Sequence, residues 1–196
     1  RGCRFCQAGM IYRPNREKDI SVLKKHAYEM LKNTGHEEIS LSSLSSSDYS
    51  QLEELVNFLI DNFKEKGVNI SLPSLRIDAF SLDVMGKVQD IRKSSLTFAP
   101  EAGSQRLRNV INKGLTEDVI LHGAGMAFEG GWQKVKLYFM LGLPTETPED
   151  MRAIAELANK IAVRYYEIPK DQRNGKCQIT ISTSFFVPKP FTPFQW

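Results

Sequence analysis

The chain has 196 residues, of which 41% are hydrophobic and 25% charged, with a formal net charge of +3 and a pI of about 8.7. These values are typical of one globular domain with a sizeable core, and they exclude a disordered or low-complexity chain. No apolar run approaches the roughly 20 residues of a membrane span, and three cysteines are too few for a disulfide framework, so we expect a cytoplasmic protein.

Hydrophobic periodicity, turn residues and helix caps predict an alternation of strands and helices along the chain. Gly35 and Gly67 are placed to end two helices, Ser50 and Glu53 have the spacing of a capping box, and Thr147 is placed to cap another helix. The expected helices cover residues 21–33, 50–66, 81–92, 103–111, 116–129 and 147–166, and the expected strands cover residues 38–44, 68–72, 95–99, 134–141 and 177–187. This order implies parallel strands with right-handed crossovers, and therefore an α/β sheet or barrel.

Two of the three cysteines, Cys3 and Cys6, stand three residues apart. Thiolates at this spacing can bind one soft metal centre, because a tight turn points both sulfur atoms inward. One interpretation is a dithiol redox site. Such a site requires the second cysteine in the first turn of a helix, which lowers its pKa, and Gly9 and Pro14 argue against that helix. Another is a zinc site, although the remaining ligands, Cys177, His26, His36 and His122, have no paired spacing. The third is an iron–sulfur cluster.

In parallel α/β folds, ligands bind at the carboxyl ends of the strands, so the residues just after each expected strand are candidates for a site. The hydroxyl-rich segment 42–49 follows the first strand, and a flexible serine loop is its alternative explanation. Arg76 follows the second strand, where pairing with a carboxylate is as plausible as ligand contact. Glu101 follows the third, and a carboxylate there can accept both hydroxyls of a ribose. Gly142 follows the fourth, where a glycine lets a flat ligand approach the backbone.

Four segments together resemble the radical S-adenosylmethionine (radical SAM) superfamily. They read Arg-Gly-Cys-Arg-Phe-Cys-Gln-Ala-Gly at 1–9, Ala-Pro-Glu-Ala-Gly-Ser at 99–104, Gly-Leu-Pro-Thr-Glu-Thr at 142–147 and Phe-Val-Pro-Lys-Pro-Phe-Thr-Pro-Phe at 186–194. The chain is most similar to the branch that contains methylthiotransferases and oxygen-independent coproporphyrinogen oxidase, within an uncharacterised bacterial subfamily. The resemblance implies a partial (β/α)6 TIM-like barrel of parallel strands, with the first strand missing.

The resemblance also implies roles for individual residues. Cys3 and Cys6 would be the second and third ligands of a [4Fe–4S] cluster in the signature Cys-x-x-x-Cys-x-x-Cys, whose first cysteine falls two residues before Arg1. We therefore expect residues 1–196 to be an N-terminally truncated core domain of a larger protein, poor at binding the cluster alone. The residues expected to contact S-adenosylmethionine are Phe5, Gly142 and Val187 at the adenine, Glu101 at the ribose, Lys113 at the methionine carboxylate, Ser43 and Ser45 at the methionine amine, and Arg76 near the barrel mouth.

The expected function is that of a radical enzyme that receives its electron from a flavodoxin or ferredoxin type of reductant. Arg13, Arg16, Arg76 and Lys189 flank the expected barrel mouth, which predicts an anionic substrate, with RNA and ribosome-associated targets ahead of small acids by family analogy. The alternative is a non-catalytic scaffold or RNA-binding module that keeps the barrel without a working cluster.

Overall fold

The computed structural model describes residues 2–43, 45–71, 96–173 and 175–196. The chain divides into two compact units, one of residues 16–94 and one of residues 1–15 and 95–196. The helix expected at 81–92 lies outside the described residues, and the single domain expected for residues 1–196 stays a prediction.

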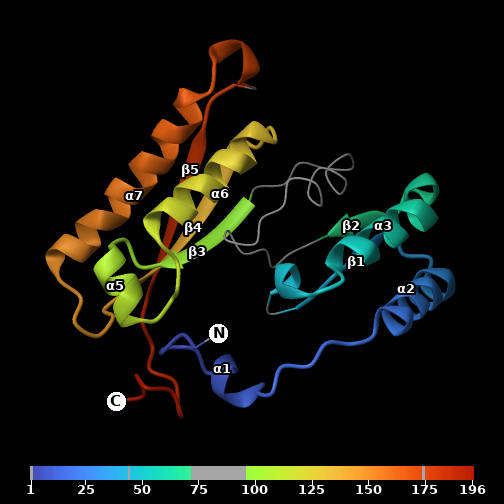
Figure 1. The fold of residues 1–196 in the computed structure, drawn as a ribbon, viewed down its shortest axis with the longest axis horizontal. Coiled ribbons are helices and arrows are strands. Elements are labelled where there is room, and N and C mark those ends of the chain that lie inside the picture. The colour runs from blue at the N-terminus through green and yellow to red at the C-terminus, as the bar shows by residue number, and fades with distance from the viewer. Residues whose placement is uncertain (1, 44, 72–95, 174) are drawn as a thin grey trace. The chain divides into compact units, whose positions relative to one another are not determined.

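The unit of residues 16–94 packs two helices against two short parallel strands (Figure 1). Asp19 caps α2 by accepting a hydrogen bond from the backbone N–H of Ser21 at 2.8 Å, and Gly35 ends that helix in the left-handed conformation. The core combines buried residues of α3, such as Leu59, with Leu31 of α2 and Ile39 of β1. The described elements are α2 (Ile20–Thr34), β1 (Glu38–Ser40), η1 (Ser46–Asp48), α3 (Leu52–Phe63), η2 (Lys64–Lys66) and β2 (Asn69–Ser71).

Two expectations about this unit are wrong. The capping box of Ser50 and Glu53 does not form, because α3 begins at Leu52 with Gln51 at its N-cap and without a side-chain cap. The hydroxyl and backbone N–H of Ser50 donate instead to the carboxylate of Glu17, at 2.5 and 3.3 Å. Strand β1 also ends at Ser40 and so is shorter than the expected 38–44.

The second unit is a three-stranded parallel sheet in the order β3–β4–β5, with helices between successive strands (Figure 1). Ser104, Thr116 and Thr147 cap its helices through their side chains, and the capping box that begins with Thr147 is complete. The described elements are α1 (Ala8–Ile11), β3 (Leu96–Glu101), α5 (Gln105–Val110), α6 (Glu117–Glu129), β4 (Lys134–Leu141), α7 (Pro148–Glu167), η4 (Lys170–Gln172) and β5 (Gln178–Phe185). One turn of helix, α1, forms around Gly9, where no helix was expected.

All described strand pairs are parallel, which confirms the α/β class. The strands form two open sheets, β1–β2 and β3–β4–β5, rather than a closed barrel. Because β3, β4 and β5 are parallel, their carboxyl ends share one edge of their sheet. The N-terminal and C-terminal segments of the chain both lie beyond this edge (Figure 1).

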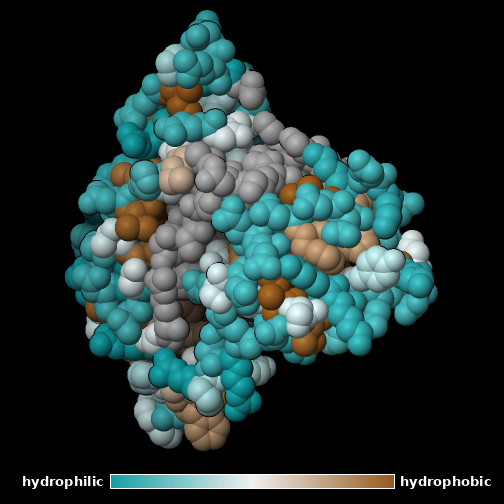
Figure 2. Space-filling view, turned by 45° about the vertical axis from the view of Figure 1, so that its right-hand side comes forward, coloured by the Kyte–Doolittle hydropathy of each residue, from teal (hydrophilic) through white to brown (hydrophobic). Residues whose placement is uncertain are grey.

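Among the described helices, none has the length and apolar composition needed to cross a membrane. The face drawn in Figure 2 is mostly hydrophilic, with hydrophobic residues in separate small groups.

Candidate functional site

The cysteine loop, which we define as residues 2–6, is a tight turn. The backbone N–H of Cys6 donates to the carbonyl of Cys3 at 3.2 Å, and helix α1 begins two residues later. Both cysteines are free and half-buried. A turn of this kind holds two thiolates close together in sequence and space, as the ligands of one soft metal centre must be.

The cysteine loop is docked on the turn that follows helix α5. The backbone N–H of Arg4 donates to the carbonyl of Ile111 at 2.9 Å, and its Nη1 donates to the carbonyl of Val110 at 2.7 Å. Asn112 donates through Nδ2 to the carbonyl of Gly2 at 2.8 Å. Three hydrogen bonds thus tie the loop to a segment that stands just after β3 and α5, so the cysteines belong to the same edge of the sheet as the strand ends.

Glu101 and Lys113 meet beside this loop. Lys113 Nζ lies 3.1 Å from Glu101 Oε1, and their side chains are only 15% and 18% exposed. The same ammonium group lies 5.9 Å from the centre of the Phe5 ring, within the range of a cation–π contact. Glu101 ends β3 at an irregularity in the register and has a φ of 69°, which is uncommon for a residue other than glycine. Left-handed residues of this kind cluster at functional sites, because the surrounding structure must hold them there.

An apolar cluster closes the space between the strand ends and the cysteine loop. Its buried members come from the loops and helix that follow β3 and β4, and they are Ala102, Leu107, Ile111 and Leu143. Half-buried side chains from the cysteine loop, from α5, from β4 and from the segment after β5 pack against them, namely Phe5, Val110, Met140, Phe186 and Phe194. The carboxyl ends of all three strands and the cysteine loop therefore meet at one apolar centre.

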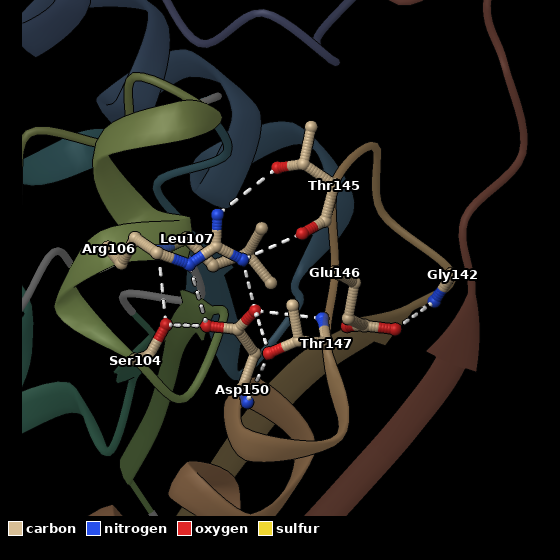
Figure 3. A network of polar contacts seen from close by, with 8 residues as sticks. All are labelled: Ser104, Arg106, Leu107, Gly142, Thr145, Glu146, Thr147 and Asp150. Atoms are coloured by element: carbon tan, nitrogen blue, oxygen red, sulfur yellow. Dashed lines mark hydrogen bonds and ion pairs between the residues drawn. The ribbon is translucent and has the colours of Figure 1, made fainter.

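A polar network joins the loop after β3 to the loop after β4 (Figure 3). The buried carboxylate of Asp150 accepts hydrogen bonds from Ser104 Oγ, from Arg106, and from the backbone N–H of Thr147 at 2.9 Å. Arg106 also donates to the carbonyl of Thr145 at 2.7 Å. Burial alone would raise the pKa of Asp150, but the hydrogen bonds from Arg106, Ser104 and Thr147 hold it well below its usual range. The carboxylate is therefore ionised and binds the starts of α5 and α7 to each other.

Arg108 supports the turn after β3 from inside the protein. Its side chain is fully buried, and Nη1 donates to the carbonyls of Ala102 at 3.2 Å and Gly103 at 2.7 Å. Nε donates to the carbonyl of Leu115 at 3.1 Å. Desolvation lowers the pKa of this guanidinium, although an arginine keeps its charge at any physiological pH. Arg108 thus fixes the backbone that directly follows Glu101.

The structure gathers most of the expected site residues at this edge. Cys3, Cys6, Phe5, Glu101 and Lys113 are linked by the contacts given above. Gly142 and Val187 follow β4 and β5 at the same edge. Gly142 is exposed and has a φ of 78°, and its N–H donates to Glu146 Oε2 at 2.6 Å. Val187 is 59% exposed.

The other expected residues divide between the two units and the residues that are not described. Ser43 and Ser45 belong to the unit of residues 16–94, where the Oγ atom of Ser43 accepts from the N–H of Ser45 at 3.2 Å. Arg16 belongs to that unit too, Arg13 and Lys189 are exposed in the other unit, and Arg76 lies outside the described residues.

Sequence reasoning missed the residues that hold the site together. Arg4 and Asn112 dock the cysteine loop, and Asp150 and Arg108 fix the turns. The signal for Asp150 was present, because it stands three residues after Thr147, the spacing of a capping box. Among the described residues, no three His, Cys, Asp or Glu side chains lie close enough together to bind one metal ion. These residues therefore do not form a closed zinc site, which needs four ligands.

Residues 1–158, which include the cysteine loop, Glu101, Lys113 and Gly142, match the radical SAM superfamily. The chain belongs to this superfamily. Over 195 residues it is 40% identical to the uncharacterized protein MJ0966 of Methanocaldococcus jannaschii, and over 210 residues it is 23% identical to the uncharacterized protein MJ1620 of the same organism.

The alignments cover 100% and 99% of this chain but only 40% and 39% of these two relatives, so the chain spans about two fifths of their length. Among solved structures, coproporphyrinogen III oxidase (HemN) from Escherichia coli, a radical SAM enzyme, superposes with a TM-score of 0.56 at 16% identity. That superposition covers 99% of this chain and 43% of HemN, and it shows that the two folds are alike over that part of HemN.

Proposed function

We propose that this chain is the core of an enzyme that uses a [4Fe–4S] cluster to cleave S-adenosylmethionine reductively. The observation that carries the proposal is the docking of the Cys3–Cys6 turn beside Glu101 and Lys113, at the carboxyl ends of β3, β4 and β5. Cysteine thiolates are the usual ligands of iron–sulfur clusters, so the two cysteines fit as ligands of such a group. When bound, the cluster supplies one electron to S-adenosylmethionine, which yields methionine and a 5′-deoxyadenosyl radical.

The residues of the chain would bind and orient the cofactor. Glu101 offers a carboxylate that accepts hydrogen bonds from ribose hydroxyls, and Lys113 beside it offers an ammonium group for the methionine carboxylate. Gly142 has no side chain and would let the flat adenine approach the backbone, and Phe5 and Val187 are our candidates for its other contacts. The apolar cluster that contains Ile111 packs against Phe5 of the cysteine loop, and it would exclude water from this region. That the hydroxyls of Ser43 and Ser45 contact the methionine amine stays a prediction.

The electron donor and the substrate are proposals by family analogy. A flavodoxin or ferredoxin type of protein would supply the electron, and an RNA or ribosome-associated target would be the substrate. If RNA binds, its affinity should fall steeply with salt, and neutralising Lys189 should make that slope shallower.

The test compares three forms of the chain after anaerobic reconstitution with iron and sulfide. The first is the chain itself, the second carries a Cys-Ala dipeptide before Arg1, and the third carries Ser-Ala there as the matched control. The dipeptide places a cysteine where the family signature has its first one. We expect about four iron atoms per chain, and 5′-deoxyadenosine after reduction, only in the Cys-Ala form.

Two further variants locate the cluster. Cys3→Ser and Cys6→Ser in the Cys-Ala form should each abolish iron binding and the release of 5′-deoxyadenosine. Equal iron in the Ser-Ala and Cys-Ala forms would contradict the proposal. RNA binding without any cluster in all three forms would support the alternative, a scaffold or RNA-binding module.

A further inference from the structure

One face of the β3–β4–β5 sheet is polar. Along β4 the residues on one face are buried, with exposed fractions of 1% for Val135, 0% for Leu137 and 1% for Phe139. On the other face Lys136 is half-buried and Tyr138 is 39% exposed. Parallel sheets are normally covered on both faces, and the interior of a (β/α) barrel is normally filled by Val, Ile and Leu. The face with Lys136 and Tyr138 therefore departs from a packed barrel interior.

The strand register extends this polar face across the sheet. Lys136 is paired with Thr97 of β3 on one side and with Thr180 of β5 on the other. One step further along, Tyr138 is paired with Ser182. Paired residues of neighbouring strands direct their side chains to the same face, so four hydroxyl-bearing residues surround Lys136 on this surface.

Among the residues that the structure describes, no acidic side chain forms an ion pair with Lys136. Its Nζ lies 4.8 Å from the centre of the Tyr138 ring, which is a close cation–π contact. None of the ion pairs among the residues that the structure describes includes Lys136, whereas Lys113, also on this unit, is paired with Glu101. Among the described residues Lys136 is thus a half-buried cation surrounded by hydroxyl groups and not paired with a carboxylate, which is the composition of an oxyanion-binding site.

The position of this surface relates it to the proposed reaction. Tyr138 and Met140 follow Lys136 on the same face of β4, and the strand then ends at Leu141, directly before Gly142. Met140 also packs against the apolar cluster that includes Phe5 of the cysteine loop. The polar face therefore leads along β4 toward the edge where the cofactor would bind.

We propose that Lys136, with the hydroxyls of Thr97, Tyr138, Thr180 and Ser182, binds an oxyanion group of the substrate, either a carboxylate or a phosphate. Lys136 supplies the charge, the hydroxyls donate hydrogen bonds, and the Tyr138 ring holds the ammonium group in place. That the occupant is the substrate rests on the proposed function, whereas the binding of an oxyanion does not. A surface of this composition disfavours cationic and purely apolar substrates.

The probes are inorganic phosphate and acetate, each added to the full chain without cluster at constant ionic strength. Lysine side-chain NMR signals report the site, with the Lys136 signal assigned from its loss in the Lys136→Met spectrum. We expect a saturable shift of the Lys136 signal and no saturable shift of Lys134, an exposed lysine two residues earlier on the same strand. Tighter saturation by phosphate assigns the group as a phosphate, and tighter saturation by acetate assigns it as a carboxylate.

Binding measured by calorimetry supplies the controls. Lys136→Met and Lys136→Gln should each weaken anion binding by about tenfold or more, because a charge-assisted hydrogen bond is lost. Lys136→Arg should largely restore it, and Lys134→Met, which removes the same charge, should leave it unchanged. Equal losses in Lys134→Met and Lys136→Met, or no saturation by either anion in the unaltered chain, would overturn the inference. Anion binding in a chain whose Cys-Ala form assembles no cluster would instead refute the proposed function alone.

Discussion

Lys113 Nζ lies 3.1 Å from Glu101 Oε1, although the two residues were expected to contact different parts of one cofactor. Glu101 has a φ of 69°, a conformation that costs an L-residue about 1–2 kcal/mol. Lys113 fixes the orientation of the Glu101 carboxylate by pairing with it. Arg108 fixes the backbone after Glu101 by binding the carbonyls of Ala102 and Gly103. Lys113 is thus a positioning residue for Glu101, whatever else it contacts.

The first prediction is that this pair acts as a unit in cofactor binding. Glu101→Gln and Lys113→Met should each weaken binding of S-adenosylmethionine to the cluster-bearing Cys-Ala form by about 1–3 kcal/mol, the scale for losing a charge-assisted hydrogen bond. The double variant should lose little more than the worse single variant, because residues in contact are not additive. Calorimetry of the four forms measures this, with Lys25→Met, which alters an exposed pair on α2, as the control. Additive losses would show that the two residues act independently.

A second prediction concerns the carboxylate of Asp150, which is 3% exposed and receives the charge of Arg106. Asp150→Asn should lower the free energy of unfolding by about 3 kcal/mol, because it leaves Arg106 and two hydroxyls without their ionised acceptor. The neighbouring Glu149→Gln is a matched control: that residue pairs with Arg152 on the surface, where a pair contributes about 0.5 kcal/mol or less. Urea denaturation of the two variants checks the difference, and equal losses would contradict the role given to Asp150.

The third prediction is the pH dependence that follows from the same carboxylate. The pKa of Asp150 is lowered in the folded chain relative to about 3.9 in the unfolded chain. The ionised carboxylate therefore stabilises the fold at all pH values above about 4, and this contribution is lost as the pH falls below that value, because the unfolded chain takes up the proton first. Urea midpoints measured from about pH 6 down to about pH 3 should fall steeply for the unaltered chain and for Glu149→Gln. The decrease should be shallower in Asp150→Asn, and an equal slope in all three would assign the acid sensitivity to other groups.

Local signals predicted much of the fold. Helices α2 and η2 end directly before Gly35 and Gly67, and α7 begins directly after its N-cap, Thr147. The error at Ser50 has a tertiary cause, because Glu17 lies 33 residues away in sequence and competes for its hydroxyl and N–H. A capping box read from four residues cannot include such a competitor.

Of the candidate site, too, one part could be predicted from the sequence and another part depends on tertiary packing. The positions of Glu101 and Gly142 follow from the rule that ligands bind at the carboxyl ends of parallel strands, which needs only the order of strands and helices. The docking of Arg4 on the carbonyls of Val110 and Ile111 depends on how two distant segments pack, and no local pattern predicts it. The same holds for the surroundings of Lys136, since the register of three strands decides which hydroxyls stand beside it.

The last prediction contrasts two buried glycines of the same unit. A Cβ atom at Gly103 would lie 2.3 Å from the backbone N of Ile154 and 2.6 Å from the carbonyl carbon of Ala153, so α7 would have to move. Gly103→Ala should therefore destabilise the unit by about 2–3 kcal/mol, and it should weaken cofactor binding because Glu101 stands two residues before it.

At Gly125 in α6, by contrast, the nearest atoms to an added Cβ are the guanidinium nitrogens of Arg164 at 3.9 and 4.0 Å, an ordinary contact. Gly125→Ala should raise the free energy of unfolding by about 0.5–1 kcal/mol, because alanine has the higher helix propensity. Thermal or urea unfolding measures the two changes in the free energy of unfolding. We expect a decrease for Gly103→Ala and an increase for Gly125→Ala, because only Gly103 lies against the backbone of α7. A stable Gly103→Ala chain with unchanged affinity for S-adenosylmethionine would mean that the turn after β3 tolerates displacement, and that the position of Glu101 does not depend on the close approach of Gly103 to α7.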